Sequence, residues 1–342
     1  MARPSQRLSW CTIVALAAAC ASNGAPSDDN TAPRANAPKT SDTAESTQTG
    51  APPIRAAIAA GTLHATGRET DFDKMFEDLA GADVVYVGEQ HDNPHHHAIQ
   101  RRVIEELWRA GRLHAIGMEM FQRPYQSVLD DFVEGRIDEA TMLERTEWKK
   151  RWGFDVALYR PIFDFARQKR LPIVALNVSN ELRKKVREGL DTLTIEERAS
   201  LPVLRLDDKE HRAFLEDVYR QHLPEGTELN VEKFERFYRI MVLWDEVMAD
   251  SVVRWFRRSP KDAQIVVLAG GGHIGNRYGI PGRAHRRDGR RYRSVICVVA
   301  GDGRPSDEQF SPRFGDYLWV TEPKPEPPPK ETAAAYSDTP KN

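Results

Sequence analysis

The sequence has few cysteines and lacks several short motifs that identify common enzyme classes. Only three of its 342 residues are cysteine, which excludes a disulfide framework and a zinc ribbon of the CxxC type. There is no G-x-S-x-G elbow, no P-loop, no HExxH helix and no CxxCH site for covalent haem. The formal net charge is −2, so no excess of positive charge directs the whole chain to nucleic acid.

The first twenty residues have the pattern of a secretory signal that ends at a cysteine. Arg3 and Arg7 form a basic start, and the apolar run Leu8–Ala19 is 12 residues long, too short to cross a bilayer core of about 30 Å as a helix. Lipidation at Cys20 is the leading interpretation, although Leu16 stands one place earlier than in a typical lipoprotein cleavage site. Ordinary cleavage just before the cysteine is the rival. We expect a cell-envelope protein, lipid-anchored to a membrane on its outer-membrane or periplasmic face.

Composition divides the chain into four segments. Residues 1–20 form the signal peptide, and residues 21–55 have too little apolar surface to offset their conformational entropy, which predicts a disordered tether. Residues 56–322 form the predicted α/β domain. The proline-rich residues 323–342 predict an exposed tail.

Short apolar runs bounded by turn residues predict five buried strands. They are Asp83–Val87, Leu113–Met118, Leu171–Leu176, Gln264–Ala269 and Ser294–Val299. Helical patterns are found at Pro94–Ala110, Tyr159–Gln168, Leu206–His222 and Val231–Phe256. The alternation predicts an α/β fold with a mostly parallel central sheet flanked by helices, and a helical insertion before the fourth strand. Ligands bind such sheets at the carboxyl ends of the strands.

The loop after the first predicted strand is rich in histidine. Glu89 and His91 are placed at the end of the strand, and His95, His96 and His97 lie on the first turn of the following helix. Histidines beside carboxylates suit metal or proton chemistry. We expect Glu89 and His91 to be functional, and His97 to face the site in preference to His95 or His96. The alternative is a solvated loop with capping residues.

Two more strand ends carry polar side chains. Glu119 follows the second apolar run, where a carboxylate needs a partner; it is either a site residue or a structural partner of Arg123 or a nearby histidine. The segment Gly270–His273 follows the fourth run. Its three glycines permit close backbone approach, and His273 then points at the strand-end crevice.

Three other features have both a structural and a functional interpretation. Asp245 lies on a long helix and either reaches the site or belongs to an ordinary polar face. Trp148 and Trp152–Asp155 form an aromatic cluster, which predicts core packing or a flat ligand surface. Seven arginines between Arg277 and Arg293 predict a solvated loop and hairpin, or contact with anionic lipid or with carboxylates of a ligand.

Several motifs, taken in order, resemble those of a known family. They are Gly88-Glu89-Gln90-His91-Asp92-Asn93-Pro94-x-His96-His97, Gly117-Met118-Glu119-Met120-Phe121-Gln122-Arg123, Leu176-Asn177, Asp245-x-x-Met248-Ala249, Ala269-Gly270-x-Gly272-His273 and Tyr278-Gly279-Ile280-Pro281. Across about residues 65–300 this set resembles the ChaN-like haem-binding lipoproteins. The wider group includes the Tiki proteases and the erythromycin esterases, which share a Gly-x-x-His turn matched here by Gly88 to His91.

The resemblance implies a surface-attached α/β protein that binds haem for iron acquisition, with haem held at the interface of a homodimer. In the family a tyrosine coordinates the iron and a histidine of the other subunit assists. Tyr125, Tyr159 and Tyr278 are the candidate tyrosines, and Tyr278 is preferred for its place beside His273. The cofactor-binding residues so implied are His91, His97, His273, Tyr278 and Glu119.

The residues themselves leave a second hypothesis open, a metal-dependent hydrolase of the peptidase or esterase kind. Glu89, His91, Glu119 and His273 would bind a divalent metal ion, or His91 would act as the general base with Glu89 as its catalytic partner. A tyrosine and an apolar slot favour haem, whereas three converging histidine or carboxylate groups with an open position favour a hydrolytic metal. A third interpretation is an envelope protein with a relic site.

Overall fold

The structure is a computed structural model that describes residues 62–65, 68–224, 226–299, 309, 311 and 313–324. The predicted signal peptide with Cys20, the tether at 21–55 and the tail from residue 325 onward lie outside the described residues. In the part that is described, no helix is both long enough and apolar enough to cross a membrane.

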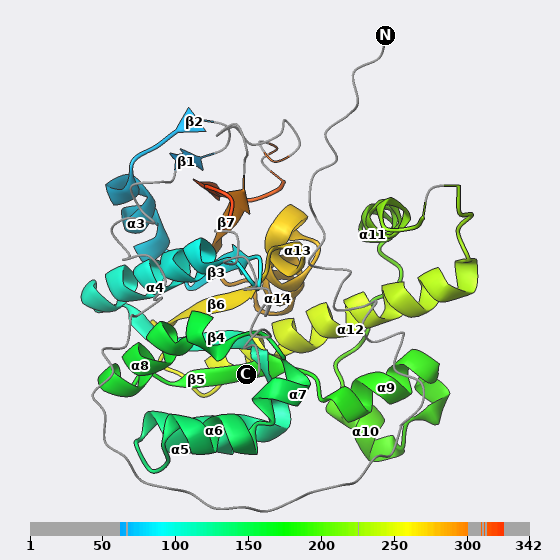
Figure 1. Ribbon diagram of the computed structural model, residues 1–342, viewed down its shortest axis with the longest axis horizontal. Helices are drawn as coiled ribbons and strands as arrows, with labels where there is room; N and C mark the ends of the chain where they lie inside the picture. Colours follow the sequence, from blue (N-terminus) through cyan, green and yellow to red (C-terminus); the bar gives the residue numbers. More distant parts are fainter. Residues whose placement is uncertain are drawn as a thin grey trace, which may run out of the picture.

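An eight-stranded sheet forms the centre of the described part (Figure 1). Its strands are β1 (Thr62–Ala65), β2 (Arg68–Glu69), β3 (Val84–Glu89), β4 (Leu113–Gln122), β5 (Ile173–Asn177), β6 (Gln264–Gly270), β7 (Tyr292–Val299) and β8 (Tyr317–Thr321). Their order is β2-β1-β8-β7-β3-β6-β4-β5, and the strands from β8 to β5 are all parallel. β1 and β2 add antiparallel strands beside β8. The predicted mostly parallel sheet is confirmed.

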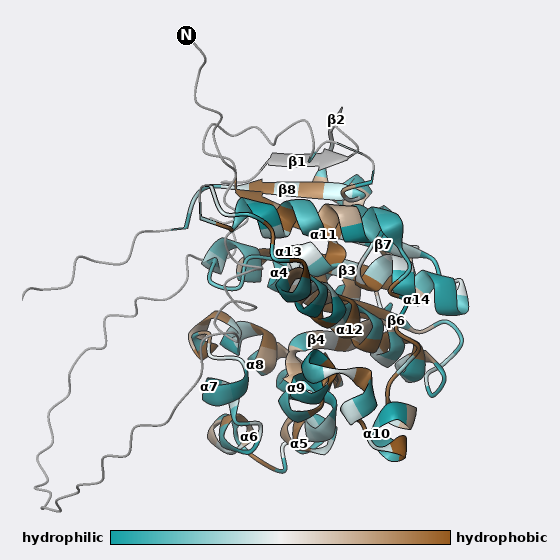
Figure 2. Ribbon diagram, turned by 90° about the vertical axis from the view of Figure 1, so that its right-hand side faces the viewer, coloured by the Kyte–Doolittle hydropathy of each residue, from teal (hydrophilic) through white to brown (hydrophobic). Residues whose placement is uncertain are grey.

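Helices cover both faces of the sheet because the central strands are apolar on both sides. In β3, Val85 and Val87 pack into one core layer, and Val84 and Tyr86 pack into the other. The first layer is covered by α3 (Phe72–Ala80), α4 (Pro94–Arg109), α5 (Gln126–Val133), α6 (Glu139–Arg145), α7 (Trp148–Arg151) and α8 (Arg160–Lys169). Figure 2 shows apolar residues along β8 and mixed polar and apolar residues on the covering helices.

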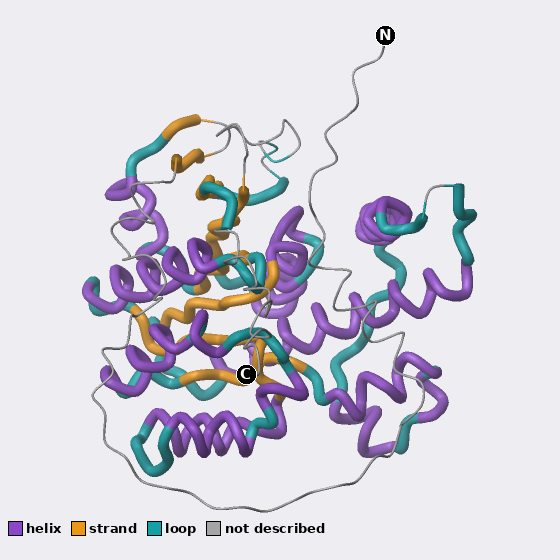
Figure 3. Tube along the Cα trace, in the orientation of Figure 1, coloured by secondary structure: helices purple, strands orange, loops and turns teal. Residues whose placement is uncertain are grey.

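The predicted helical insertion is confirmed. Between β5 and β6 the chain forms α9 (Asn180–Glu188), α10 (Ile195–Ser200), α11 (Lys209–Gln221) and α12 (Val231–Phe256). These helices gather at one side of the sheet (Figure 3). α12 has the bounds that its periodicity predicts, and it packs against β5 and against α14 (Ile280–Asp288).

The edge strands beside β7 and the arginine-rich stretch are among the places where the structure differs from the prediction. The strands β1, β2 and β8 were not predicted, because their runs are short and β8 lies next to the proline-rich tail. The arginine-rich stretch, expected as a loop and hairpin, instead forms η4 (Gly275–Arg277), α14 and the start of β7. Pro281 stands in the first turn of α14, where proline is tolerated, and does not interrupt a helix.

Candidate functional site

The carboxyl ends of β3, β4 and β6 meet at one edge of the sheet. Glu89 is the last residue of β3 and pairs in register with Gly270, the last residue of β6. β4 continues to Gln122, so Glu119 lies within this strand and not after it as predicted. The Glu119 carboxylate accepts a hydrogen bond from the Gly270 N–H at 2.7 Å. Two buried carboxylates therefore flank the end of β6.

The turn after β3 is shaped by close packing and by a helix cap. A Cβ at Gly88 would lie 3.1 Å from the Gly271 Cα, so glycine lets β3 approach α13 (Gly271–Ile274) this closely. The Asn93 side chain accepts a hydrogen bond from the His95 N–H, and Pro94 begins α4. The chain thus turns back on itself and brings the loop histidines toward Glu89.

Glu89 is the centre of the first cluster. Its Oε1 lies 2.8 Å from His91 Nδ1 and accepts a hydrogen bond from the Tyr159 hydroxyl at 3.1 Å. Its Oε2 lies 3.2 Å from His97 Nδ1, so His97 is the helix-turn histidine that faces the site. Burial raises the pKa of Glu89, but His97 and His91 outweigh burial and lower it to about 2. Glu89 is therefore ionised at neutral pH.

The Nδ1 of His91 is bonded to Glu89, so Nε2 is the ring nitrogen left to act on a ligand. Its ring contacts Trp152 edge-on, with centroids 4.7 Å apart, and Phe154 at 5.0 Å. A Cβ at Gly270 would lie 3.3 Å from His91 Nε2, so this nitrogen faces the end of β6. Burial lowers the pKa of His91, but the neighbouring carboxylates, Glu89 first, raise it overall. The aromatic cluster predicted around Trp152 is thus part of the core and also a wall of the site.

His273 is the centre of the second cluster. Its Nδ1 lies 2.7 Å from Asp245 Oδ1, and its Nε2 lies 3.5 Å from Glu119 Oε1. Burial lowers the pKa of His273, but Glu119 and Asp245 raise it to about 9, so the imidazole is positively charged at neutral pH. Arg123, the alternative structural partner of Glu119, instead donates to Asp250 at 2.8 Å.

Asp245 reaches the site from α12 and extends the second cluster toward α11. Its Oδ2 lies 3.8 Å from His211 Nε2, and His211 Nδ1 lies 2.9 Å from a guanidinium nitrogen of Arg283. Burial lowers the pKa of His211 to about 4, so this histidine is neutral. The Tyr278 ring stacks on it, with centroids 5.6 Å apart and planes inclined by 25°.

His96 is bonded within the loop and to a distant strand. Its Nδ1 accepts a hydrogen bond from the Gln90 N–H at 2.9 Å, and its Nε2 lies 3.2 Å from the Thr321 hydroxyl in β8. It is completely buried, and burial lowers its pKa to about 3. His96 therefore ties the loop to a strand far along the chain.

The model of the family described as "Haem-binding uptake, Tiki superfamily, ChaN" matches residues 75–283, more than half of the chain. The chain belongs to this ChaN family. No curated protein sequence matches the chain.

Solved structures are similar to this chain to different degrees. A structure of cofacial haem binding to ChaN of Campylobacter jejuni is 20% identical, covers 77% of this chain and 97% of its own, and superposes with a TM-score of 0.59. A mutant erythromycin esterase in its open conformation is 16% identical over 74% of this chain and 80% of its own, with a TM-score of 0.42. The first similarity establishes the fold, whereas residue roles rest on the geometry of this chain.

Among the three candidate tyrosines of this ChaN-family chain, Tyr125 and Tyr278 are both half-buried and differ in the partners of their hydroxyl groups. Tyr159 is completely buried, with its hydroxyl on Glu89. The Tyr125 hydroxyl donates to Glu147 at 2.9 Å. Tyr278 is half-buried, and its hydroxyl makes a longer contact of 3.4 Å with Glu210.

The surroundings of Tyr278 fit the needs of haem, which are a tyrosine or histidine ligand, apolar rings and cations for the propionates. The ring of Phe214 lies 5.8 Å from that of Tyr278. Arg313 lies 3.1 Å from the Glu210 oxygen that Tyr278 also contacts. The side chains of His91 and His273 are only 6% and 7% exposed, so a porphyrin plane does not reach them in this arrangement.

The acidic and histidine side chains were also predicted as divalent-metal ligands. Among the described residues, no three histidine, cysteine, aspartate or glutamate side chains are arranged to hold a metal ion. Glu89 and Asp245 each contact a histidine Nδ1, and Glu119 is bonded to a backbone N–H. Each of these carboxylates is thus already bonded to a histidine or to the backbone.

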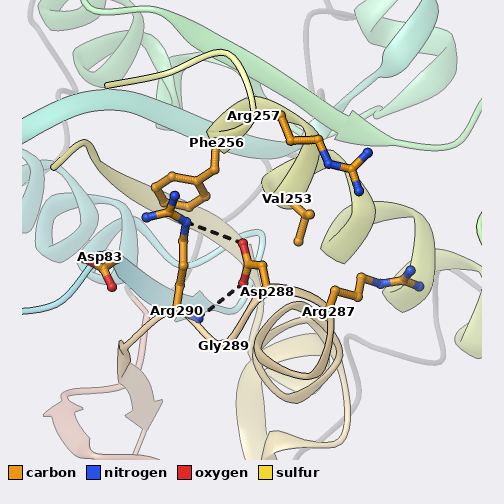
Figure 4. Close-up of a pocket in the computed structure, with 8 residues that line it drawn as sticks. All are labelled: Asp83, Val253, Phe256, Arg257, Arg287, Asp288, Gly289 and Arg290. Atoms are coloured by element: carbon orange, nitrogen blue, oxygen red, sulfur yellow. Dashed lines mark hydrogen bonds and ion pairs between the residues drawn. The ribbon is translucent and has the colours of Figure 1, made fainter. Parts of the chain in front are cut away.

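The last part of the arginine-rich stretch, from Arg287 to Arg293, lies at the opposite, amino-terminal end of the strands. Part of it lines a cavity of about 450 Å³ between the carboxyl ends of α12 and α14 (Figure 4). There Arg290 lies over the Phe256 ring, 3.8 Å from its centroid, and 3.4 Å from Asp288, while Arg287 pairs with Glu246. Helix carboxyl ends favour basic side chains, so a structural role accounts for these arginines.

Two residues of the site were missed, His211 and Arg283. His211 lies on a helix whose pattern shows only an amphipathic face, and Arg283 is one of seven arginines that look alike in the sequence. Only burial singles them out, since both are at most 2% exposed. The sequence carries no comparable signal.

Proposed function

We propose that this ChaN-family chain binds haem and that Tyr278 supplies the iron ligand. Membership of a haem-binding uptake family supports the first part. The position of Tyr278 carries the second, because its ring is stacked on a buried histidine while the residue as a whole is only half-buried. Tyrosine is an established protein ligand of haem iron.

Neighbouring side chains would hold the rest of the group. Phe214 offers an apolar ring beside Tyr278, and Arg313 offers a guanidinium, which matches carboxylates such as the haem propionates. An iron-binding tyrosine near the surface suits a protein that takes up haem and passes it on.

The test is a haem titration of the purified chain, read by the Soret band. We expect a saturable shift that Tyr278→Phe removes. Tyr219→Phe, a half-buried tyrosine on α11 outside the site, is the matched control and keeps the shift. Absence of a saturable shift in the unmodified chain would refute haem binding, and loss of the shift in Tyr125→Phe alone would move the ligand there.

A second function, acid–base hydrolysis of a peptide or an ester, is favoured by one specific observation. His91 and His273 are each bonded through Nδ1 to a buried carboxylate at the same end of the sheet. His91 with Glu89 has the form of a general base, and the cationic His273 would stabilise developing negative charge.

These two functions separate experimentally. His91→Gln would abolish turnover of a peptide or ester substrate and leave the haem titration unchanged, because His91 does not line the Tyr278 face. Metal analysis of the same sample tests the divalent-ion alternative for Glu89, His91, Glu119 and His273. A stoichiometric metal with no Soret shift would favour the hydrolase.

We also propose that the chain is exported and anchored to the cell envelope by a lipid on Cys20, and that it forms a homodimer when haem is bound. The signal pattern of residues 1–20 supports the anchor. Mass spectrometry of the membrane fraction would detect a lipidated amino-terminal cysteine, and Cys20→Ala would move the protein out of that fraction. Sedimentation with and without haem measures the dimer.

A further inference from the structure

The turn that leads to Tyr278 is strained. Asn276 and Arg277 have φ angles of 56° and 63°, in the left-handed region that non-glycine residues rarely adopt. Such conformations persist where surrounding contacts hold them, and they concentrate at functional sites. The Asn276 N–H donates to the Phe314 carbonyl at 3.0 Å, which holds the start of the turn.

The turn also packs unusually close to its neighbours. A Cβ at Gly279 would lie 2.1 Å from the His273 carbonyl oxygen, and a Cβ at Gly282 would lie 2.0 Å from the Arg277 carbonyl oxygen. Only glycine fits at these two positions. Tyr278 therefore sits on a segment whose backbone is pressed directly against the second cluster.

One buried guanidinium holds the other end of this turn. Arg283 is 1% exposed, and its Nε donates to the Tyr278 carbonyl at 3.1 Å. Its Nη2 lies 2.9 Å from His211 Nδ1, and its Nη1 pairs with Glu246. A rigid planar fork thus joins α11, α12 and the turn, which are distant in the sequence.

His211 links Arg283 to the phenol ring of Tyr278. Because Arg283 donates to Nδ1, the imidazole proton is on Nε2, which points toward Asp245 at 3.8 Å. Arg283 thus holds one ring nitrogen of His211, and the other faces Asp245 without a hydrogen bond. The Tyr278 ring stacks on this imidazole, which leaves the hydroxyl end toward the surface.

Pairing with Glu246 does not by itself explain why Arg283 is buried. Arg286 also reaches Glu246, at 3.0 Å, from a more exposed position. Replacing a buried ion pair with apolar residues is often neutral or stabilising, so an ion pair of this kind is weak evidence for a stabilising role. Its contacts with Tyr278 and His211 point to a positional role.

We infer that Arg283 is a positioning residue for Tyr278. It fixes the Tyr278 carbonyl directly and the phenol ring through His211, so that the hydroxyl is presented in one orientation. The inference rests on the proposed role of Tyr278 as the iron ligand, but the placement itself is measurable without haem.

The first experiment uses the haem-free full chain labelled with 3-fluorotyrosine. The ¹⁹F resonance of Tyr278 is assigned by its absence in Tyr278→Phe. We expect Arg283→Gln and His211→Ala to shift and broaden this resonance. Arg286→Gln, which removes another arginine from the same carboxylate, is the matched control and leaves it unchanged. An unchanged resonance in Arg283→Gln would overturn the inference.

The second experiment adds haem. Arg283→Gln is expected to weaken haem binding by about tenfold, the effect of one charge-assisted hydrogen bond. His211→Phe keeps a ring for stacking and should weaken it less than His211→Ala. If the unmodified chain binds haem and Arg283→Gln binds equally well, the positioning role fails while the proposed function stands. If the unmodified chain does not bind haem, the proposed function fails, and the ¹⁹F result alone decides the placement.

A folding defect is excluded in parallel. Circular dichroism and urea unfolding of each variant report whether the domain is intact. Arg283→Lys keeps a positive charge beside Glu246 but cannot form the planar fork. This variant should therefore fold and still disturb the Tyr278 resonance. An Arg283→Lys resonance identical to that of the unmodified chain would contradict the inference even if Arg283→Gln unfolds.

Discussion

Glu89 and His91 stand two residues apart in one loop, whereas Asp245 and His273 come from α12 and α13, 28 positions apart. Both pairs place a buried carboxylate on a histidine Nδ1, at 2.8 Å and 2.7 Å. Glu119 raises the pKa of both histidines, and its Oε1 lies 3.5 Å from His273 Nε2. The comparison teaches that the same carboxylate–histidine pair can be built from residues adjacent in the sequence or from two separate helices.

The two clusters should also differ in how strongly they hold the fold. Glu89→Gln removes the charge that serves His91, His97 and Tyr159 together, and breaking a buried pair of this kind costs about 3–5 kcal/mol. Urea unfolding would show that loss in the free energy of unfolding. Asp92→Asn, in the same loop but near the surface, is the control and should change it by less than about 0.5 kcal/mol. Equal effects would mean that Glu89 has no special role.

The second cluster should lose its stabilising effect at alkaline pH. Since the folded pKa of His273 is raised from 6.5 to about 9, the folded state binds its proton more tightly than the unfolded state does. The stabilisation is fully present below pH 6.5 and is lost as the pH rises through 9, and it amounts to roughly 3 kcal/mol. The free energy of unfolding, measured from pH 6 to 10, should fall less steeply in Asp245→Asn. If the free energy of unfolding fell equally in the unmodified chain and in Asp245→Asn, the raised pKa assigned to His273 would be contradicted.

The first cluster should instead lose its stabilising effect at acidic pH. The folded pKa of Glu89 is lowered from 4.5 to about 2, so its contribution to the free energy of unfolding is present above pH 4.5 and is lost as the pH falls through 2.

Tyr159→Phe, which removes one donor to the Glu89 carboxylate, should lower the free energy of unfolding at neutral pH by about 1.5–3 kcal/mol. Tyr125→Phe removes a hydrogen bond to the more exposed Glu147 and should have a smaller effect. A reversed order would show that Tyr159 contributes through packing alone.

The smallest expected effect tests whether the first cluster depends on local structure. Asn93→Ala removes the cap of α4 and should cost about 1 kcal/mol. Histidine NMR should show a changed environment for His91 and none for His273, because the cap shapes only the loop after β3. A change at both histidines would mean that the two clusters are coupled through Gly270.

Much of the first cluster could be predicted because its parts are adjacent. A glycine at a strand end, a carboxylate, a histidine two residues on and an asparagine–proline helix start define the loop, and His97 follows on the first helical turn. His97 was preferred over His96 as the site-facing histidine, and the bond of His96 to Thr321 could not be foreseen, since β8 was not predicted.

By itself, the sequence determined the strands with long apolar runs, the bounds of α12 and the position of Glu89 and His91 at the end of the first predicted strand. Hydrophobic periodicity and short chain separation decide these features locally. Only the tertiary structure decided that Asp245 holds His273, that Arg283 lies beneath Tyr278 and that the arginine-rich stretch is a helix. Those contacts depend on strand register and on how α11, α12 and α14 pack together, and neither is encoded in any short run of residues.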